Sequence, residues 1–272
     1  VQDVPAPLTS KRGVPILPEY GEWGLGISAN PFLDYLGNFM NGDAGNPSPD
    51  FLFPTHPFDG TAIWGKYIVD ENTAYRVRFN ASAGSSITKA VVAQDQLTPD
   101  PLFPAFTEDW RKDNFKNFAL AAGLEKRRGV SRLQGVYGGE LVFALSKTNT
   151  EFQYGNPITA DFNAPTTSFL SALGSSVRQT EINRGSNFTI GARGFIGVEY
   201  FFAPKISIGG EFGYMFRFET DGKSVITTEQ WNPNTQSVHT IKSDAYDAGA
   251  GFTFVGLGLD NLNGSINLLF YF

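Results

Sequence analysis

Apolar and polar residues alternate along most of this chain, and helical spacing is scarce. Residues 73–83, for example, place Tyr75 and Val77 on one face of an extended strand and Arg76 and Arg78 on the other. A period of two predicts β-strands with one apolar and one polar face. Eight strands are predicted in this way, at residues 22–29, 61–69, 73–83, 117–127, 133–146, 186–202, 205–219 and 265–272.

The connections between these strands fall into two classes. Tight turns are predicted at residues 70–72, 128–131 and 203–204, and long loops near 30–60, 86–114, 148–186 and 220–262. Short turns on one side and long loops on the other are typical of transmembrane β-barrels, whose long loops lie outside the cell. The pattern predicts an all-β fold, a single antiparallel transmembrane β-barrel of eight strands with short periplasmic turns and long extracellular loops. Residues 1–21 are interpreted as a periplasmic N-terminal extension and residues 22–272 as the barrel.

Residues 248–264 do not fit this scheme, because they are apolar enough to form a further strand. Counting them as a separate spanning strand would break the even number of strands. We interpret their first part as folded within the last long loop, or as an upper extension of the final hairpin. A barrel of ten strands is the alternative.

A soluble β-sandwich also alternates, but its polar face would be solvated surface. Two features favour the barrel. The apolar faces end in aromatic pairs, as in the aromatic girdles at membrane interfaces: Tyr200 and Phe202, Phe216 and Phe218, Phe270 and Phe272. The polar faces carry both charge signs, and the interior of an eight-stranded barrel is just wide enough for side chains to fill it. The predicted interior ion network consists of Arg76, Arg78, Glu125, Glu140, Arg193, Glu199, Glu211 and Arg217.

The sequence SINLLFYF at residues 265–272 looks like the C-terminal strand signature that outer-membrane proteins present to the barrel assembly machinery. Ile266, Leu268, Phe270 and Phe272 would be its lipid-facing residues, and its pairing partner is predicted to be the first strand. Together with ILPEYGEWGLGISANPFLDYLGNFMN, this ending resembles small outer-membrane β-barrel proteins of Bacteroidota-type bacteria, in the OmpA/OmpX-like class. The resemblance implies the cell outer membrane of a Gram-negative bacterium, with a signal peptide removed. It implies no activity, so no functional residue is carried over.

Composition excludes several classes of site. The chain has no Cys, which removes disulfides and Cys-based metal sites. Its net charge of -6 argues against nucleic acid as a partner. Only two histidines occur, and each has possible catalytic neighbours in sequence: His56 with Asp50 and Asp59, and His239 with Ser243 and Asp244. We favour ordinary loop histidines, because no nucleophile motif accompanies either one.

Loop acids offer oxygen atoms to a cation, but their spacing is not that of an EF-hand, so no metal and no cofactor are expected. These acids are Asp43, Asp50 and Asp59 in the first loop and Asp244 and Asp247 in the last. The loops also contain apolar segments, which mark either an interface or a lid folded inward. These are residues 32–40, 51–58, 101–106 and 169–174, with Trp110 and Trp231 nearby.

The leading hypothesis is a non-enzymatic outer-membrane barrel that acts through its extracellular loops, as an interaction or accessory subunit of a larger complex. The alternatives are a narrow pore for small solutes and a loop-sited hydrolase or acyltransferase. The expected partners are outer-membrane lipid and lipopolysaccharide, the barrel assembly machinery during biogenesis, and other outer-membrane proteins.

Overall fold

The computed structural model describes residues 8–28, 63–129, 131–169, 176–244, 253–259 and 265–272. These residues form one antiparallel sheet of eleven strands. No helix in this described part is long and apolar enough to cross a membrane. The strands are β1 (Trp23–Ser28), β2 (Ile63–Asp70), β3 (Thr73–Ala93), β4 (Phe106–Arg128), β5 (Leu133–Gln153), β6 (Val177–Ala203), β7 (Ile206–Asp221), β8 (Val225–Asn232), β9 (Ser237–Asp244), β10 (Thr253–Leu259) and β11 (Ser265–Tyr271).

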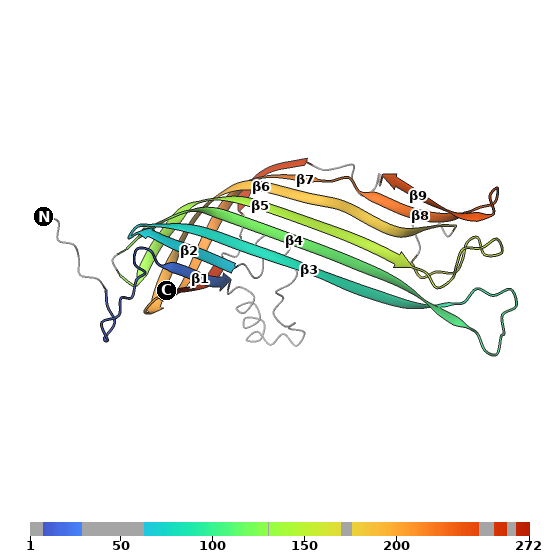
Figure 1. The fold of residues 1–272 in the computed structure, drawn as a ribbon, viewed down its shortest axis with the longest axis horizontal. Helices are drawn as coiled ribbons and strands as arrows, with labels where there is room; N and C mark the ends of the chain where they lie inside the picture. Colours follow the sequence, from blue (N-terminus) through green and yellow to red (C-terminus); the bar gives the residue numbers. More distant parts are fainter. Residues whose placement is uncertain (1–7, 29–62, 130, 170–175, 245–252, 260–264) are drawn as a thin grey trace.

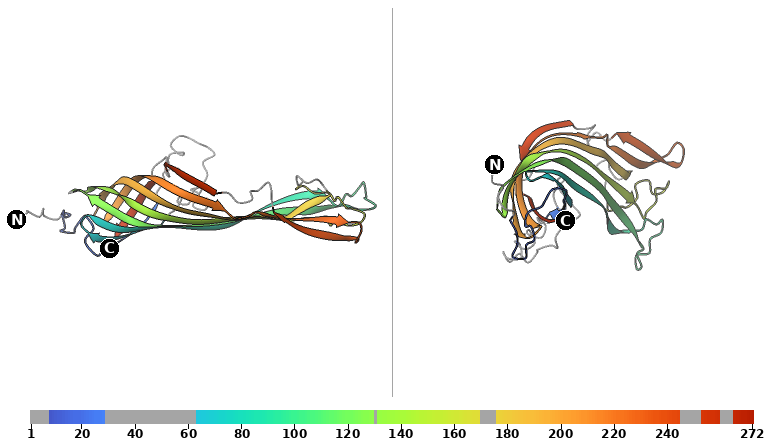
Figure 2. Two further views of the ribbon diagram at one scale, coloured as in Figure 1. Left: turned by 90° about the horizontal axis from the view of Figure 1, so that it is seen from above. Right: turned by 60° about the vertical axis from the view of Figure 1, so that its left-hand side comes forward.

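Eight of the strands close into a ring, in the order β1–β2–β3–β4–β5–β6–β7–β11 and back to β1. Closure comes from β1 pairing with β11, with Gly24 opposite Tyr271 and Ser28 opposite Asn267. The prediction that residues 265–272 pair with the first strand is therefore confirmed. Both views in Figure 2 show the sheet curving round on itself at the end of the molecule that carries the two termini.

The ring reverses the usual distribution of side chains. In β1 the outward positions are exposed and the inward ones buried in strict alternation, and lower β3 follows the same rule. Most outward residues of the ring are apolar, and many of the inward ones are charged. Ile266 and Leu268 on β11, with Phe270 and Phe272 after them, occupy outward positions, and Phe270 and Phe272 are exposed.

The long loops were predicted too long, because four strands continue beyond the ring (Figure 1). β3 and β4 stay in register from Ser82 opposite Asn117 to Ala93 opposite Phe106, which leaves only residues 94–105 as their connection. β5 runs on to Gln153 and β6 begins at Val177. We call this part the protruding sheet: residues 83–93, 106–116, 147–153 and 177–186, with β8 and β9 beside β6.

The predicted loop at 220–262 is also wrong in its described part, since it contains β8, β9 and β10. β10 pairs with upper β7, from Thr253 opposite Thr220 to Leu259 opposite Tyr214, whereas β11 pairs with lower β7. Residues 253–259 thus extend the sheet above β11, in agreement with the interpretation of this segment as an upper extension of the final hairpin. The ring passes through eight strands, not ten. The first predicted loop, residues 30–60, lies outside the described residues.

The tight turns lie at the end of the ring away from the protruding sheet. At the β2–β3 turn, the backbone N–H of Asn72 donates to the Asp70 carboxylate, with N and O 2.8 Å apart. This hydrogen bond lowers the pKa of the Asp70 carboxyl below its usual value. At the β6–β7 turn, Lys205 adopts a φ of 61°, a left-handed conformation that lets two residues reverse the chain.

Candidate functional site

Nine charged side chains meet inside the ring, and each is at most 5% exposed. They occupy inward positions, and the period of two sends their apolar neighbours outward. We call them the interior ion cluster: Lys66 on β2, Arg76 and Arg78 on β3, Glu125 and Arg127 on β4, Glu140 on β5, Arg193 and Glu199 on β6, and Glu211 on β7.

The part of the cluster nearer the protruding sheet is organised around Glu140 and Glu211. Arg76 lies between them, with guanidinium nitrogens 2.6 Å from a Glu140 oxygen and 3.0 Å from a Glu211 oxygen. Arg193 joins the same two acids, at 3.1 Å and 2.8 Å. Arg78 lies 2.6 Å from Glu140. Glu140 therefore meets three guanidinium groups at once, which compensates much of the cost of burying its charge.

The other part is organised around Glu125 and Glu199. The Lys66 ammonium lies 2.9 Å from Glu125 and 3.2 Å from Glu199. Arg127 reaches the same two acids at 3.6 Å and 3.3 Å. Arg76 lies 3.2 Å from Glu125 and so joins the two parts. The nine groups form one continuous network rather than separate pairs.

Two hydroxyl groups complete the network at Glu199. The Tyr271 hydroxyl donates to Glu199 over 2.6 Å and accepts a hydrogen bond from Arg127 over 3.2 Å. The Ser207 hydroxyl donates to the same Glu199 oxygen. These bonds tie β11, the closing strand, to β4 and β6 across the interior.

Aromatic rings and small residues give the guanidinium groups their space. The Arg76 guanidinium carbon lies 3.9 Å from the centre of the Phe195 ring and 4.7 Å from that of Trp64, within cation–π range. Gly213 faces the Arg193 guanidinium so closely that a Cβ there would fall 2.2 Å from its Nε. Within the described residues, the ring is thus filled by paired charges and aromatic rings.

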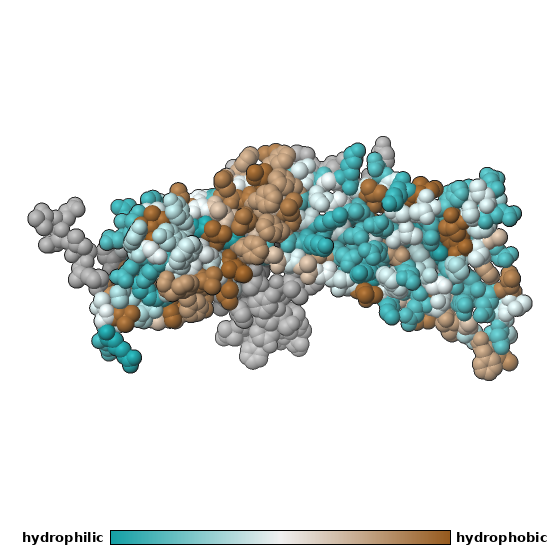
Figure 3. Space-filling view, viewed as in Figure 1, coloured by the Kyte–Doolittle hydropathy of each residue, from teal (hydrophilic) through white to brown (hydrophobic). Residues whose placement is uncertain are grey.

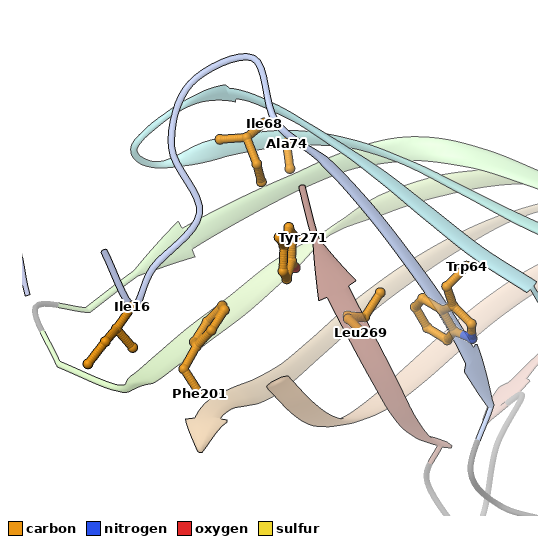
Figure 4. Close-up of a cluster of buried hydrophobic side chains, with 7 residues drawn as sticks. All are labelled: Ile16, Trp64, Ile68, Ala74, Phe201, Leu269 and Tyr271. Atoms are coloured by element: carbon orange, nitrogen blue, oxygen red, sulfur yellow. The ribbon is translucent and has the colours of Figure 1, made fainter. Parts of the chain in front are cut away.

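An apolar cluster extends from the end of the ring with the tight turns, where Ile16 and Phe201 lie, to Trp64 at the level of Arg78 (Figure 4). Ile16, from the segment before β1, lies against it, and the Ile16 carbonyl accepts a hydrogen bond from the Lys205 N–H over 3.0 Å. Leu269 is an apolar residue on the inward face of β11, between Asn267 and Tyr271, and it packs into this cluster. The cluster consists of Ile16, Trp64, Ile68, Ala74, Phe201, Leu269 and Tyr271.

The structure brings seven of the eight residues of the predicted ion network together. The exception is Arg217, which lies further along β7 with its Nε 3.5 Å from Glu219. Sequence reasoning missed Lys66 and Arg127. Arg127 was detectable, because it follows Glu125 by two residues and shares its face. Lys66 was obscured by its inward neighbours Trp64 and Ile68, which belong to the apolar cluster.

Outside the ring, exposed apolar side chains form a belt, part of which is the brown area in the upper middle of Figure 3. It runs along β5 from Leu133 to Leu145 and along β7 from Ile208 to Phe216, and these four residues are exposed. Where the ring meets the protruding sheet, four phenylalanines from four neighbouring strands contact one another edge to face, with ring centres 5.2–6.3 Å apart. We call them the phenylalanine row: Phe79, Phe118, Phe143 and Phe188.

The protruding sheet has a buried polar network of its own. Asp109 is fully buried on β4 and accepts hydrogen bonds from the Gly155 N–H at 2.8 Å and the Thr167 hydroxyl at 2.7 Å. The side-chain amide of Asn156 donates to the Ala93 carbonyl over 2.8 Å, and the main-chain carbonyl of Asn156 accepts a hydrogen bond from Arg178 over 2.6 Å. The connection after β5 is therefore fastened to the sheet at several points.

Tyr154 belongs to the same network. Its hydroxyl donates to the Gln179 carbonyl over 2.6 Å, and the Arg178 guanidinium carbon lies 4.4 Å from the centre of its ring. Burial raises the pKa of Tyr154 to about 12.

The far end of the protruding sheet is apolar and exposed. Leu102 and Phe103 are 81% and 80% exposed, and Leu97 and Phe106 lie close by in sequence and are also exposed. We call these four residues the apolar tip. Their connection is held in shape at its base, where the Gln94 N–H donates to the Ala105 carbonyl over 2.9 Å. Exposed apolar patches on an ordered scaffold are typical of interaction sites.

His239, Ser243 and Asp244, which were considered for catalysis, lie among the described residues and form no hydrogen-bonded catalytic arrangement there. His239 lies on β9, where its ring nitrogens are 2.9 Å from the Thr235 hydroxyl and 3.2 Å from the Asn232 amide. Its hydrogen bonds do not reach Ser243 or Asp244. No group of three metal-binding side chains occurs in the described ranges. Outside those ranges lie His56, Asp43, Asp50, Asp59 and Asp247.

A scan against protein-family models finds no match, and a search of curated proteins finds no similar sequence. The function is therefore inferred from the chain's own residues.

Proposed function

We propose that this protein is an outer-membrane β-barrel that holds the protruding sheet outside the cell and binds a partner protein there, as a non-enzymatic accessory subunit. The closed ring would be the barrel, and the tight turns would face the periplasm. The proposal for the membrane is supported by the inverted distribution of side chains. The proposal for the function is carried by one observation, the apolar tip at the end of an ordered sheet.

The size of the apolar belt fits a bilayer. The twelve steps from Leu133 to Leu145 cover about 40 Å along β5 at about 3.3 Å per residue. At a strand tilt of about 40°, this corresponds to a height of about 30 Å, close to the hydrocarbon thickness of a membrane. A soluble ring of this kind would expose its apolar side chains to water while burying its charges.

The interior ion cluster supports a closed barrel rather than a pore. Its charges are paired with one another and packed against aromatic rings, and an eight-stranded barrel leaves little free lumen. We therefore expect no discrete conductance from the purified protein in planar bilayers. Regular single-channel steps would instead support the narrow pore, the second of the functions considered from the sequence.

The function is tested by affinity purification from gently solubilised native membranes. We expect a partner protein to accompany the wild type and to be lost from Leu102→Ser/Phe103→Ser. The matched control is Val238→Ser/Ile241→Ser, which removes two exposed apolar residues from β9, away from the tip. A wild type that purifies alone, or a partner retained by the tip variant, would contradict the proposal.

A further inference from the structure

Two lysines stand side by side where the protruding sheet begins, on the same outward face as the phenylalanine row and directly above it. Lys116 on β4 is opposite Lys147 on β5 in the antiparallel register, and both side chains are exposed. Lys116 is the next outward residue after Phe118, and Lys147 is the next after Leu145. The lysine pair therefore marks the level at which the outward face changes from apolar to polar.

Like charges at directly opposed positions destabilise a sheet, because their Cβ atoms lie only about 5 Å apart. No described side chain relieves this repulsion. Lys116 lies opposite Ala83 on its other side, and Lys147 lies opposite Ser186. Neither lysine forms an ion pair within the described residues, in a chain whose net charge is -6. An external anion would remove the cost.

The nearest outward acid along β5 is engaged elsewhere. Glu151 lies two outward positions beyond Lys147 and is opposite Lys112. It accepts hydrogen bonds from the side-chain amides of Asn114 and Asn149, over 3.3 Å and 3.1 Å. These two asparagines separate Glu151 from the lysine pair.

We propose that Lys116 and Lys147 bind the phosphate of an outer-leaflet glycolipid whose acyl chains lie against the phenylalanine row. Two ammonium groups provide up to six donors for one phosphate. On β3, Ala83 is opposite Lys116 and Ala81 is opposite Phe118, and these small outward side chains leave room for a headgroup. The inference rests on the proposed membrane placement and deepens it, because it names a lipid phosphate as a specific ligand of the barrel's outer surface.

The site is tested with the full chain in micelles of an uncharged detergent, supplemented with bisphosphorylated lipid A. Bound lipid is counted by native mass spectrometry. We expect Lys116→Gln/Lys147→Gln to bind about tenfold more weakly, since each lysine near a charged headgroup contributes a several-fold effect. Lys116→Arg/Lys147→Arg should retain binding. Dephosphorylated lipid A should bind the wild type as weakly as lipid A binds the Gln variant.

The control is Lys89→Gln/Lys112→Gln, which removes the same charge from outward positions further along the sheet. Lys89 pairs with Glu108 at 3.2 Å, and Lys112 lies opposite Glu151. We expect this variant to bind lipid A like the wild type. An equal loss in the control would overturn the site, because the effect would then follow overall charge. Displacement of lipid A by millimolar inorganic phosphate would overturn the assignment to a lipid.

The two levels of inference fail differently. If the protein does not insert into phospholipid vesicles, and heating before detergent gel electrophoresis does not change its migration, the membrane placement is overturned, and the lipid site with it. A protein that inserts normally, but whose lysine-pair variant binds lipid A like the wild type, would overturn the lysine pair alone.

Discussion

Replacing Glu140 by glutamine is the sharpest test of the interior ion cluster. Glu140 lies within 2.6–3.1 Å of guanidinium nitrogens of Arg76, Arg78 and Arg193. The cluster holds five cations and four carboxylates, so Glu140→Gln raises its formal excess of positive charge from one to two. Glutamine has nearly the same shape, and the change therefore isolates the charge. Removing one partner of a buried ion pair costs about 3–5 kcal/mol, because the remaining charges stay buried without full compensation.

The assay is urea unfolding of the protein in phospholipid vesicles, followed by the fluorescence of its four tryptophans. The control is Glu108→Gln, which breaks the exposed pair with Lys89 at 3.2 Å and should cost at most about 1 kcal/mol. A free energy of unfolding for Glu140→Gln within about 1 kcal/mol of the wild type would refute the reasoning. It would mean that water or mobile side chains already neutralise this position.

A double variant sharpens the result. Adding Arg78→Gln to Glu140→Gln returns the formal excess to one. We expect the two changes together to cost less than the sum of the single changes, with a coupling of about 1–3 kcal/mol. Strict additivity would show that the 2.6 Å contact between these residues contributes no pairing energy.

Three further outcomes are expected. Gly213→Ala should lower the free energy of unfolding by about 1–3 kcal/mol through overpacking, because the new Cβ would fall 2.2 Å from the Arg193 Nε. The control is Gly194→Ala, whose Cβ would lie 4.0 Å from its nearest neighbour and should not lower stability by overpacking. The pKa of Asp70 is lower in the folded protein than the value of 3.8 in the unfolded chain. Its contribution to stability is therefore present above pH 3.8 and is lost as the pH falls through the folded-state pKa. Asp70→Asn should reduce the dependence of the free energy of unfolding on pH in this acid range. Asn156→Ala removes the hydrogen bonds to the Ala93 and Thr166 carbonyls; hydrogen exchange should quicken in the connection after β5 and stay unchanged in the ring.

The strands of the ring were predictable because most of their outward residues are apolar and many of their inward residues are charged. The sequence of β3 from Tyr75 to Arg78 alternates so strictly that strand type and the face of each residue follow from the period alone. Closure by residues 265–272 followed from the need to leave no open edge. Lys66 was harder to place, since it lies between the apolar residues Trp64 and Ile68 on the inner face of β2.

The protruding sheet was not predictable from the same signal. From Ser85 to Lys89 every residue of β3 is exposed, so no apolar face marks the strand. Its extended form is maintained by backbone pairing with β4, a partner some twenty to thirty residues away in sequence, which local patterns do not encode. The buried network around Asp109 likewise joins residues that are about fifty positions apart.

The continuity of β3 to β6 from the ring into the protruding sheet has a mechanical consequence. The 21 residues of β3 span about 70 Å as one hydrogen-bonded element, with no loop along it to act as a hinge. A partner that binds the far end would contact a rigid extension of the ring rather than a segment on a flexible linker. Little orientational freedom is then lost on binding, and any pull on that end would be transmitted as torque to the base.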